Sequence, residues 1–223
     1  QLIDKPIQKQ EIKSQLKVIA DNLNGFFTIN YSDEMPNVAI FVSKQNHCLI
    51  DLLWRVRNGE LKMKVPLIIS NHKELEYIAN DFNSKFVYFD TFNNSKTNVE
   101  SEILNLLSDF DIKLVVLAKY MQILSETFLQ NFSSIINIHH SFLPAFKGSQ
   151  PYHRAWERGV KLIGATAHYV TKDLDEGPII EQCTVNVSHR DEVDDLIRKG
   201  RDIERVALAR AVRMHLNHQV FVY

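Results

Sequence analysis

The chain has 223 residues, of which 45% are hydrophobic and 24% charged, and its formal net charge is −1. That balance is typical of a globular protein with one main domain. A chain so close to neutrality has no basic field to attract a polyanion, so we expect no nucleic-acid partner.

Membrane and cysteine signals are equally sparse. No apolar run approaches the roughly 20 residues that span a bilayer, and the N-terminus has no signal-peptide pattern, so we expect no membrane partner. Cys48 and Cys183 lie far apart, without the spacing of a disulfide framework or a zinc site. A reducing, cytoplasmic location fits these features best. The chain opens on Gln1 rather than on methionine, which suggests a piece of a longer protein.

The first 30 residues differ in pattern from the rest. We expect a helix over residues 8–23 and a strand over residues 26–29, followed by a linker that ends at Pro36. This segment is too short to form a domain by itself.

From residue 37 onward, short β-branched runs alternate with longer amphipathic runs. The expected strands cover residues 37–42, 65–69, 86–88, 113–117 and 135–138. The expected helices between them cover residues 47–57, 71–80, 97–107 and 125–130. This alternation predicts an α/β fold with a mostly parallel, doubly wound sheet that is covered on both faces.

Local signals mark the ends of three of these helices. Gly59 follows the first helix at the C′ position. Asn71 with Glu74, and Thr97 with Glu100, form the capping patterns that are expected to begin the next two.

The pattern changes after residue 150. We expect a helix over residues 151–158, two strands over residues 162–170 and 179–187, a long helix over residues 191–215 and a terminal strand over residues 220–222. The two strands are joined by a turn rich in Asp, Gly and Pro, which predicts that they pair as a hairpin.

Polar side chains end the apolar strand expected at residues 135–138. Asn137 and His139 lie two residues apart, so their side chains leave an extended chain on the same face. An amide and an imidazole directed at one atom stabilise an oxyanion, a contact whose loss costs about 3 kcal/mol of transition-state stabilisation. An asparagine at this place can equally close an Asx turn, and both interpretations stay open.

His140 is expected to face the other way and to have a structural role. Together with His153 and His168 it suggests a metal site. However, no Cys or carboxylate lies at a ligand spacing such as H-E-x-x-H, so we expect no metal.

Asp175 lies in the turn between the last two expected strands, where turn chemistry alone explains an aspartate. His168 on the preceding strand favours a second interpretation, because a carboxylate beside two histidines is able to hold and deprotonate water. Asn137, His139 and Asp175 then form a set for attack on a formamide or ester carbonyl. No G-x-S-x-G motif supplies a competing nucleophile.

The glycines exclude two common nucleotide sites. None of the seven glycines forms G-x-G-x-x-G or G-x-x-x-x-G-K-[ST]. The turn after the first expected strand, residues 43–47, is polar but has no glycine, so backbone amides cannot easily close around a phosphate there. Lys44 and the following helix N-terminus are still able to attract an anion.

Asn137, His139 and Asp175 belong to a set of longer motifs. These motifs cover residues 117–124, 137–146, 159–169 and 175–182. As a set these motifs resemble the formyltransferase superfamily that uses 10-formyltetrahydrofolate, and within it the formyltetrahydrofolate deformylase family. The similarity runs from about Pro36 to the C-terminus. Residues 1–30 resemble the end of the ACT regulatory domain that precedes the catalytic domain in this family. The resemblance therefore implies an ACT remnant at residues 1–30, a linker at residues 31–36 and a catalytic domain at residues 37–223.

The resemblance also implies a fold of the formyltransferase type, with a C-terminal hairpin and a long helix, and a function. The implied reaction is hydrolysis of 10-formyltetrahydrofolate to tetrahydrofolate and formate, which supplies formate for purine synthesis and balances the one-carbon folate pools. It needs no metal or other cofactor, and the enzyme is expected to be a cytoplasmic homo-oligomer.

By the same resemblance, Asn137 and His139 stabilise the oxyanion, and Asp175 positions and activates water. The residues implied to bind the folate are Met121, Gln122, Ile123, Leu124, His168 and Leu174.

Two other functions stay open from the sequence. Glycinamide ribonucleotide formyltransferase shares the three catalytic residues but passes the formyl group to a phosphorylated amine, which it holds with a glycine-rich turn after the first strand. The glycine-free residues 43–48 favour hydrolysis over this transfer. The third possibility is a folate-binding module without catalysis, which would not require all three of Asn137, His139 and Asp175.

Overall fold

The computed structural model describes residues 9–31, 33–144 and 151–222. The chain divides into two compact units, residues 1–34 and 35–223. In the first unit, helix α1 (Lys9–Asn22) has no buried residue, and Lys9 pairs with Asp33 at 3.1 Å. The strand expected at residues 26–29 is wrong: this stretch has no regular structure, because none of the described residues forms a neighbouring strand for it. The ACT-like origin of this unit stays a prediction.

The second unit is built on a seven-stranded sheet in the order β3-β2-β1-β4-β5-β6-β7. The strands are β1 (Asn37–Val42), β2 (Lys64–Ser70), β3 (Lys85–Tyr88), β4 (Ile112–Leu117), β5 (Ile135–His139), β6 (Leu162–Tyr169) and β7 (Ile179–Asn186). The first five pair in parallel, whereas β6 pairs antiparallel with both β5 and β7. The mostly parallel sheet and the C-terminal hairpin are both confirmed.

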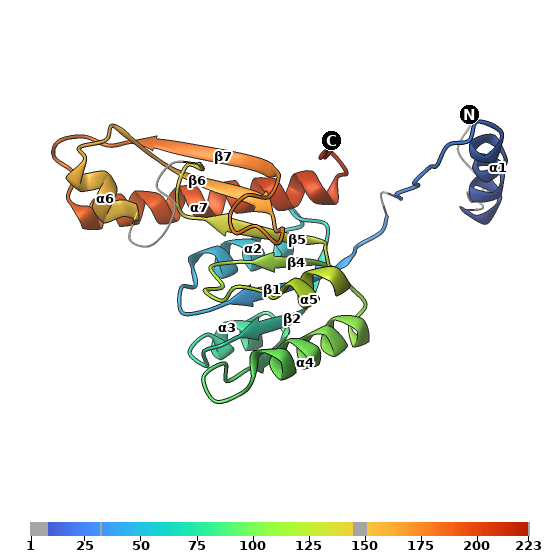
Figure 1. The fold of residues 1–223 in the computed structure, drawn as a ribbon, viewed down its shortest axis with the longest axis horizontal. Helices are drawn as coiled ribbons and strands as arrows, with labels where there is room; N and C mark the ends of the chain where they lie inside the picture. Colours follow the sequence, from blue (N-terminus) through green and yellow to red (C-terminus); the bar gives the residue numbers. More distant parts are fainter. Residues whose placement is uncertain (1–8, 32, 145–150, 223) are drawn as a thin grey trace. The chain divides into compact units, whose positions relative to one another are not determined.

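Helices cover both faces of the sheet (Figure 1). They are α2 (His47–Arg57), α3 (Glu76–Asp81), α4 (Lys96–Asp109), α5 (Glu126–Asn131), α6 (Pro151–Glu157) and α7 (Val193–Leu216). Helices α2, α3 and α7 pack on one face in a single apolar cluster, and α4 and α5 pack on the other. The long red helix α7 lies alongside β6 in Figure 1, and it contacts β5, β6 and β7.

Strand β1 is buried on both faces of the sheet, which explains why its sequence is apolar without alternation. Val38 and Ile40 belong to the cluster on the α7 face, and Ala39 and Phe41 belong to the cluster on the α4 face. All four are fully buried, as expected for a central strand of a parallel sheet that is covered twice.

The capping predictions met different outcomes. Gly59 follows α2 with a φ of +74°, so the predicted C′ glycine is confirmed. The cap predicted at Asn71 is wrong, because α3 begins at Glu76. The Asn71 side chain instead accepts a hydrogen bond of 2.6 Å from the Ser43 hydroxyl, which ties the end of β2 to the end of β1.

The cap predicted at Thr97 is also wrong. Helix α4 begins one residue earlier, and the Ser95 side chain caps it by accepting from the backbone N–H of Asn98. Glu100 is not part of a capping box, because its carboxylate accepts a 2.9 Å hydrogen bond from the backbone N–H of Ser125 at the start of α5.

The terminal strand predicted at residues 220–222 is wrong as well. Helix α7 ends at Leu216, and residues 217–222, the last that the structure describes, form no strand. Phe221 is 85% exposed, so it has no apolar neighbour to fix an extended segment against the sheet. Within the described residues, every helix is too short or too polar to cross a membrane.

Candidate active site

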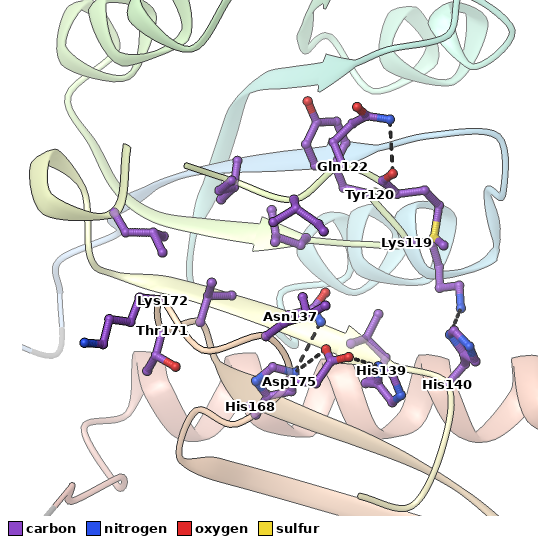
Figure 2. A pocket seen from close by; sticks show the side chains of 18 residues that line it. Lys119, Tyr120, Gln122, Asn137, His139, His140, His168, Thr171, Lys172 and Asp175 are labelled. Atoms are coloured by element: carbon purple, nitrogen blue, oxygen red, sulfur yellow. Dashed lines mark hydrogen bonds and ion pairs between the residues drawn. The ribbon is translucent and has the colours of Figure 1, made fainter. Parts of the chain in front are cut away.

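A pocket of about 310 Å³ lies at the carboxyl ends of β4 and β5 (Figure 2). The strand order reverses between β1 and β4, and such switch points are where open α/β sheets bind ligands. The walls of the pocket come from the end of β4 with the loop after it, helix α5, the end of β5 with the residue after it, and the end of β6 with the hairpin loop.

Asn137 and His168 meet because β5 and β6 are antiparallel and place them directly opposite each other. The His168 Nδ1 atom lies 2.9 Å from the carbonyl oxygen of Tyr169, which only accepts, so Nδ1 carries the proton. In the neutral ring the Nε2 atom then accepts from the Asn137 Nδ2 atom at 3.2 Å. This contact sets the orientation of the amide and leaves its second N–H for a ligand.

The hairpin loop carries Asp175 back over the sheet end. Asp175 has a φ of +58°, and the backbone N–H of Tyr169 donates to the carbonyl of Pro178 at 2.9 Å. The loop packs so closely that a Cβ on Gly177 would lie 1.8 Å from the carbonyl oxygen of Tyr169. Glycine at this position is therefore required to bring Asp175 to the pocket.

Asp175 faces two histidines. Its Oδ2 atom lies 3.2 Å from His139 Nδ1, and its Oδ1 atom lies 3.7 Å from His168 Nε2. The hydrogen bond from His139, with a smaller contribution from the neighbouring His168, outweighs partial burial and holds the pKa of Asp175 well below its usual range. Asp175 is therefore an ionised carboxylate at neutral pH.

His139 offers a single nitrogen to this carboxylate. Its Nε2 atom is buried and has no hydrogen-bond partner among the described residues. A buried nitrogen without a partner is least costly as a lone pair, so the proton resides on Nδ1, which donates to Asp175. Asn137 and His139 thus lie together as β-strand alternation predicts, and both line the pocket.

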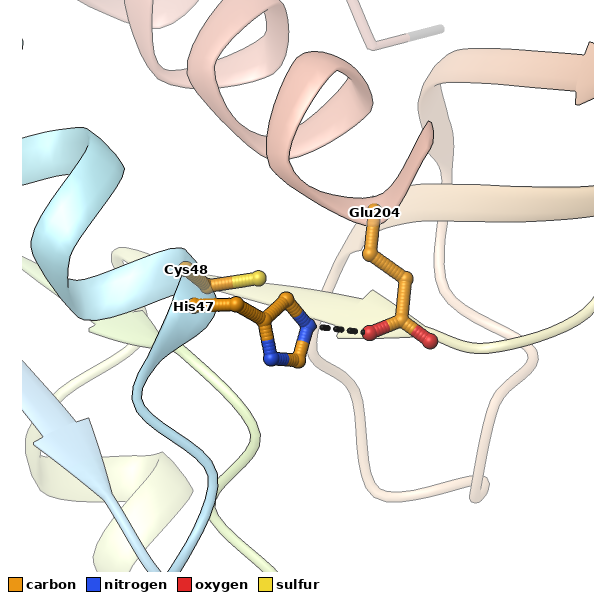
Figure 3. A group of neighbouring side chains, drawn as sticks. All are labelled: His47, Cys48 and Glu204. Atoms are coloured by element: carbon orange, nitrogen blue, oxygen red, sulfur yellow. Dashed lines mark hydrogen bonds and ion pairs between the residues drawn. The ribbon is translucent and has the colours of Figure 1, made fainter. Parts of the chain in front are cut away.

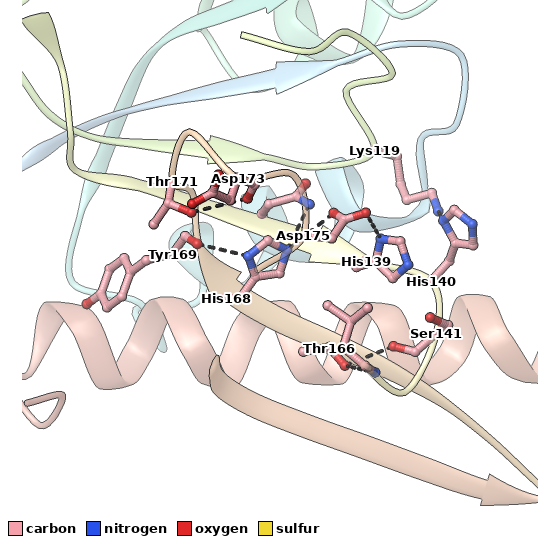
Figure 4. Close-up of polar contacts among 12 residues, drawn as sticks. Lys119, His139, His140, Ser141, Thr166, His168, Tyr169, Thr171, Asp173 and Asp175 are labelled. Atoms are coloured by element: carbon pink, nitrogen blue, oxygen red, sulfur yellow. Dashed lines mark hydrogen bonds and ion pairs between the residues drawn. The ribbon is translucent and has the colours of Figure 1, made fainter. Parts of the chain in front are cut away.

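The prediction that His140 faces away from the site is wrong. His140 lines the same pocket, and its ring stacks on His139 with centroids 4.8 Å apart and an interplanar angle of 17°. Strand β5 ends at His139, so the alternation of an extended chain no longer applies to the next residue. His140 Nδ1 also lies 3.3 Å from the Lys119 ammonium (Figure 4).

Side chains of β6 and β7 hold the loop after β5 by hydrogen bonds. Thr166 donates to the carbonyl of Ser141 at 2.8 Å and accepts from the backbone N–H of Leu143 at 3.0 Å. Gln182 on β7 donates to the carbonyl of Leu143 at 3.0 Å. Ala145 and Phe146, which belong to the sequence motif, lie outside the described residues.

All six residues implied to bind the folate line the pocket: Met121, Gln122, Ile123, Leu124, His168 and Leu174. Met121, Ile123 and Leu174 are each more than 60% exposed, so they offer apolar surface to a ligand. The Ser43 hydroxyl accepts from the backbone N–H of Met121 at 2.9 Å and so positions this loop. The roles of these residues toward a ligand stay predictions.

Sequence reasoning missed Lys119. It lines the pocket, is only 7% exposed and has a φ of +67°, which is rare for a residue with a side chain. The signal was present, because Lys119 is a polar residue just after the buried strand β4.

Within the described part of the chain, one group of side chains has the composition of a metal site. Ligand atoms of His47, Cys48 and Glu204 lie within 4.8 Å of one another (Figure 3). However, the Lys119 ammonium lies 3.4 Å from Glu204 Oε1, and the Tyr152 hydroxyl donates to the same oxygen at 2.8 Å. A cation already balances this carboxylate, so the group fits an internal ion pair better than a metal site.

The family model described as Formyl transferase matches residues 36–212, which is most of the chain. The chain belongs to the formyl transferase family. The family fold expected from the motifs is thereby confirmed, and the pocket lies inside the matched segment.

Several named proteins of this fold are closely similar to the chain. Formyltetrahydrofolate deformylase of Synechocystis sp. is 57% identical over 97% of this chain and 76% of its own length. The crystal structure of a formyltetrahydrofolate deformylase from Pseudomonas syringae aligns with a TM-score of 0.93 and 40% identity, over 98% of this chain and 74% of that one. A glycinamide ribonucleotide transformylase from Symbiobacterium toebii aligns with a TM-score of 0.80 and 30% identity, over 88% of this chain and 95% of that one.

Proposed function

We propose that this chain hydrolyses 10-formyltetrahydrofolate to tetrahydrofolate and formate, in keeping with its relatives' name, formyltetrahydrofolate deformylase. The observation that carries the proposal is the ionised Asp175 paired with His139 at 3.2 Å, beside the oriented amide of Asn137, in a pocket with an apolar rim. A water molecule on the carboxylate and an oxyanion on the two N–H groups is the arrangement that formamide hydrolysis needs.

The reaction balances with these three side chains. The water oxygen attacks the formyl carbon while Asp175 accepts one water proton, and the carbonyl electron pair moves onto oxygen. Asn137 and His139 donate to that oxyanion. When the intermediate collapses, the bond from carbon to N10 breaks, and the proton that Asp175 accepted passes to N10. Formic acid then leaves and ionises to formate. We propose no metal or other cofactor in these steps.

The contact between His139 and Asp175 also explains how a carboxylate of low pKa becomes a useful base. The hydrogen bond from His139 is the largest cause of the lowered pKa. A substrate oxygen that takes over this N–H removes the stabilisation of the carboxylate. Asp175 therefore becomes more basic as the substrate is bound and attacked.

The turn after β1 favours water over a phosphorylated amine as the formyl acceptor. His47, the first residue of α2, donates to Glu204 at 2.6 Å, so a carboxylate of this chain already lies at the helix N-terminus. The Ser43 hydroxyl is bound to Asn71 and Met121. Since Ser43 and His47 are engaged within the chain and the Glu204 carboxylate lies beside them, a phosphate would meet repulsion there.

The proposed location is the cytoplasm, which suits two free cysteines, and the proposed assembly is a homo-oligomer. Exposed apolar side chains such as Phe221 support self-association.

The test is a coupled assay of tetrahydrofolate and formate release from 10-formyltetrahydrofolate, with EDTA present and with or without glycinamide ribonucleotide. Release without the acceptor is the expected result. Turnover that requires the acceptor would make the chain a transformylase, and folate binding without turnover would make it a binding module.

A further inference from the structure

A buried polar cluster connects helix α7 to the active site. It consists of Glu204 on α7, His47 on α2, Tyr152 on α6 and Lys119 after β4. Glu204 is 1% exposed and is contacted by all three of the others. Four distant segments of the chain thus meet at one carboxylate. The proposed reaction steps use none of these four residues.

Glu204 is ionised in this setting. Burial by itself would raise the pKa of Glu204, but the hydrogen bond from His47 and the charge of Lys119 overcome it and lower the pKa to about 2. Helix α7 accommodates the cluster through Gly200, where a Cβ would lie 2.1 Å from the Tyr152 hydroxyl oxygen. The absence of a side chain there lets Tyr152 reach Glu204 one helical turn further on.

The cluster ends on His140. The Lys119 ammonium lies 3.3 Å from His140 Nδ1 and 3.4 Å from Glu204 Oε1. An ammonium group only donates, so His140 Nδ1 accepts, and the ring is the neutral tautomer with its proton on Nε2. A second positive charge on His140 would face the ammonium directly.

His140 in turn supports the catalytic histidine. Its ring lies nearly parallel to His139 at 4.8 Å, and His139 donates to Asp175. The titratable groups that face His140 include His139 from β5, Lys119 from the loop after β4 and Tyr152 from α6, with Glu204 of α7 behind Lys119. A charged His140 would add a positive charge beside Asp175 and make this carboxylate a weaker base.

We propose that Lys119, anchored by Glu204, is a positioning residue for the hydrolysis: it keeps His140 uncharged and stacked on His139. Lys119 acts through His140 and does not itself touch the reacting atoms. The kinetic consequence rests on the proposed function, whereas the state of His140 does not.

The kinetic test compares pH profiles of formate release. In Lys119→Met, His140 is free to take a proton below neutrality, so kcat at about pH 6 should fall at least about tenfold relative to kcat at about pH 8.5. KM should change by less than about threefold, because the apolar rim is intact. Lys119→Arg restores a cation and should return the profile toward that of the unaltered protein.

Lys119→Met leaves the buried Glu204 carboxylate with His47 and Tyr152 but without the ammonium, and can fail to fold. The double variant Lys119→Met/Glu204→Gln removes both charges and should show the same direction of change. Lys199→Met is the matched control, since it breaks another ion pair of α7, with Asp191 at 2.7 Å, away from the pocket lining. Its pH profile should be parallel to that of the unaltered protein.

A structural readout separates this inference from the proposed function. In a ¹⁵N-histidine NMR spectrum, with the His140 signals assigned by their loss in His140→Gln, His140 should show the neutral tautomer protonated on Nε2. In the double variant it should become protonated as the pH falls. An unchanged His140 signal together with a parallel pH profile would overturn the inference. If the protein released no formate at all, the proposed function would fail and the NMR result would still decide the role of Lys119.

Discussion

Asn137 and His168 lie directly opposite each other on β5 and β6, with Asn137 Nδ2 3.2 Å from His168 Nε2. The pair orients an amide. The His168 ring, held by the carbonyl of Tyr169, accepts a hydrogen bond from one N–H of Asn137 and leaves the other N–H for the pocket. In the proposed reaction, His168 therefore acts on the oxyanion through Asn137.

This relationship predicts a specific pattern in mutant kinetics. Asn137→Ala should lower kcat by about 100-fold or more, as for a lost oxyanion donor. His168→Phe keeps a ring but removes the acceptor, so it should lower kcat by about tenfold to 100-fold. Because both act on one contact, the double variant should be no slower than Asn137→Ala alone. If the double variant were instead slowed by the product of the two single-variant effects, His168 would have a separate role.

Asp175→Asn tests the proposed base. Folate binding should stay nearly intact, while kcat falls by at least about 100-fold, because an amide cannot accept the water proton. Equilibrium binding of the product and single-turnover formate release measure the two quantities separately. A near-normal rate would remove Asp175 from the mechanism.

His139→Ala should behave similarly, because it removes the N–H that points at the oxyanion and at Asp175. If this variant keeps its activity, the role passes to His168, whose Nε2 lies 3.7 Å from Asp175.

Gly177→Ala should displace the catalytic loop. The new Cβ would lie 1.8 Å from the backbone oxygen of Tyr169, and backbone cannot move aside as a flexible side chain does. We expect kcat to fall by at least about tenfold through misplacement of Asp175. The control is Gly59→Ala, where φ is +74° and nothing lies within 4 Å. It should cost about 1 kcal/mol of unfolding free energy and leave kcat unchanged.

The buried Glu204 predicts a pH dependence of stability. Its folded-state pKa of about 2 lies below the usual 4.5, so its stabilisation is complete above about pH 5 and is lost as the pH falls toward about 2. The shift corresponds to about 3 kcal/mol of unfolding free energy. Glu204→Gln should lose about this amount at neutral pH and should flatten the stability curve in the acid range, as measured by urea unfolding.

Asp111→Asn is the control for this prediction. The ion pair between Asp111 and Lys113, at 2.5 Å, is as short as the 2.6 Å contact between Glu204 and His47. However, the Asp111 side chain is 75% exposed. Solvent screens such a pair, so its loss should cost at most about 1 kcal/mol at any pH. An equal loss in the two variants would contradict the burial argument for Glu204.

Several errors of the sequence analysis share one physical origin. Asn71 and Glu100 carry the residue types of helix caps, yet each is engaged by a residue far along the chain, Ser43 and Ser125 respectively. Residues 26–29 and 220–222 have the composition of strands but no neighbouring strand. Local propensity describes what a segment prefers, and tertiary contacts decide between preferences of similar energy.

The sequence by itself determined the α/β class, the parallel core of the sheet, the C-terminal hairpin and the common face of Asn137 and His139. These follow from the periodicities of helix and strand, which are local properties of the backbone. Only the tertiary structure decided that His168 lies opposite Asn137, that Gly177 lets Asp175 reach His139, and that Lys119 meets Glu204 across 85 residues. Those contacts depend on strand register, on close backbone packing and on the burial of charge, which join segments that no local pattern relates.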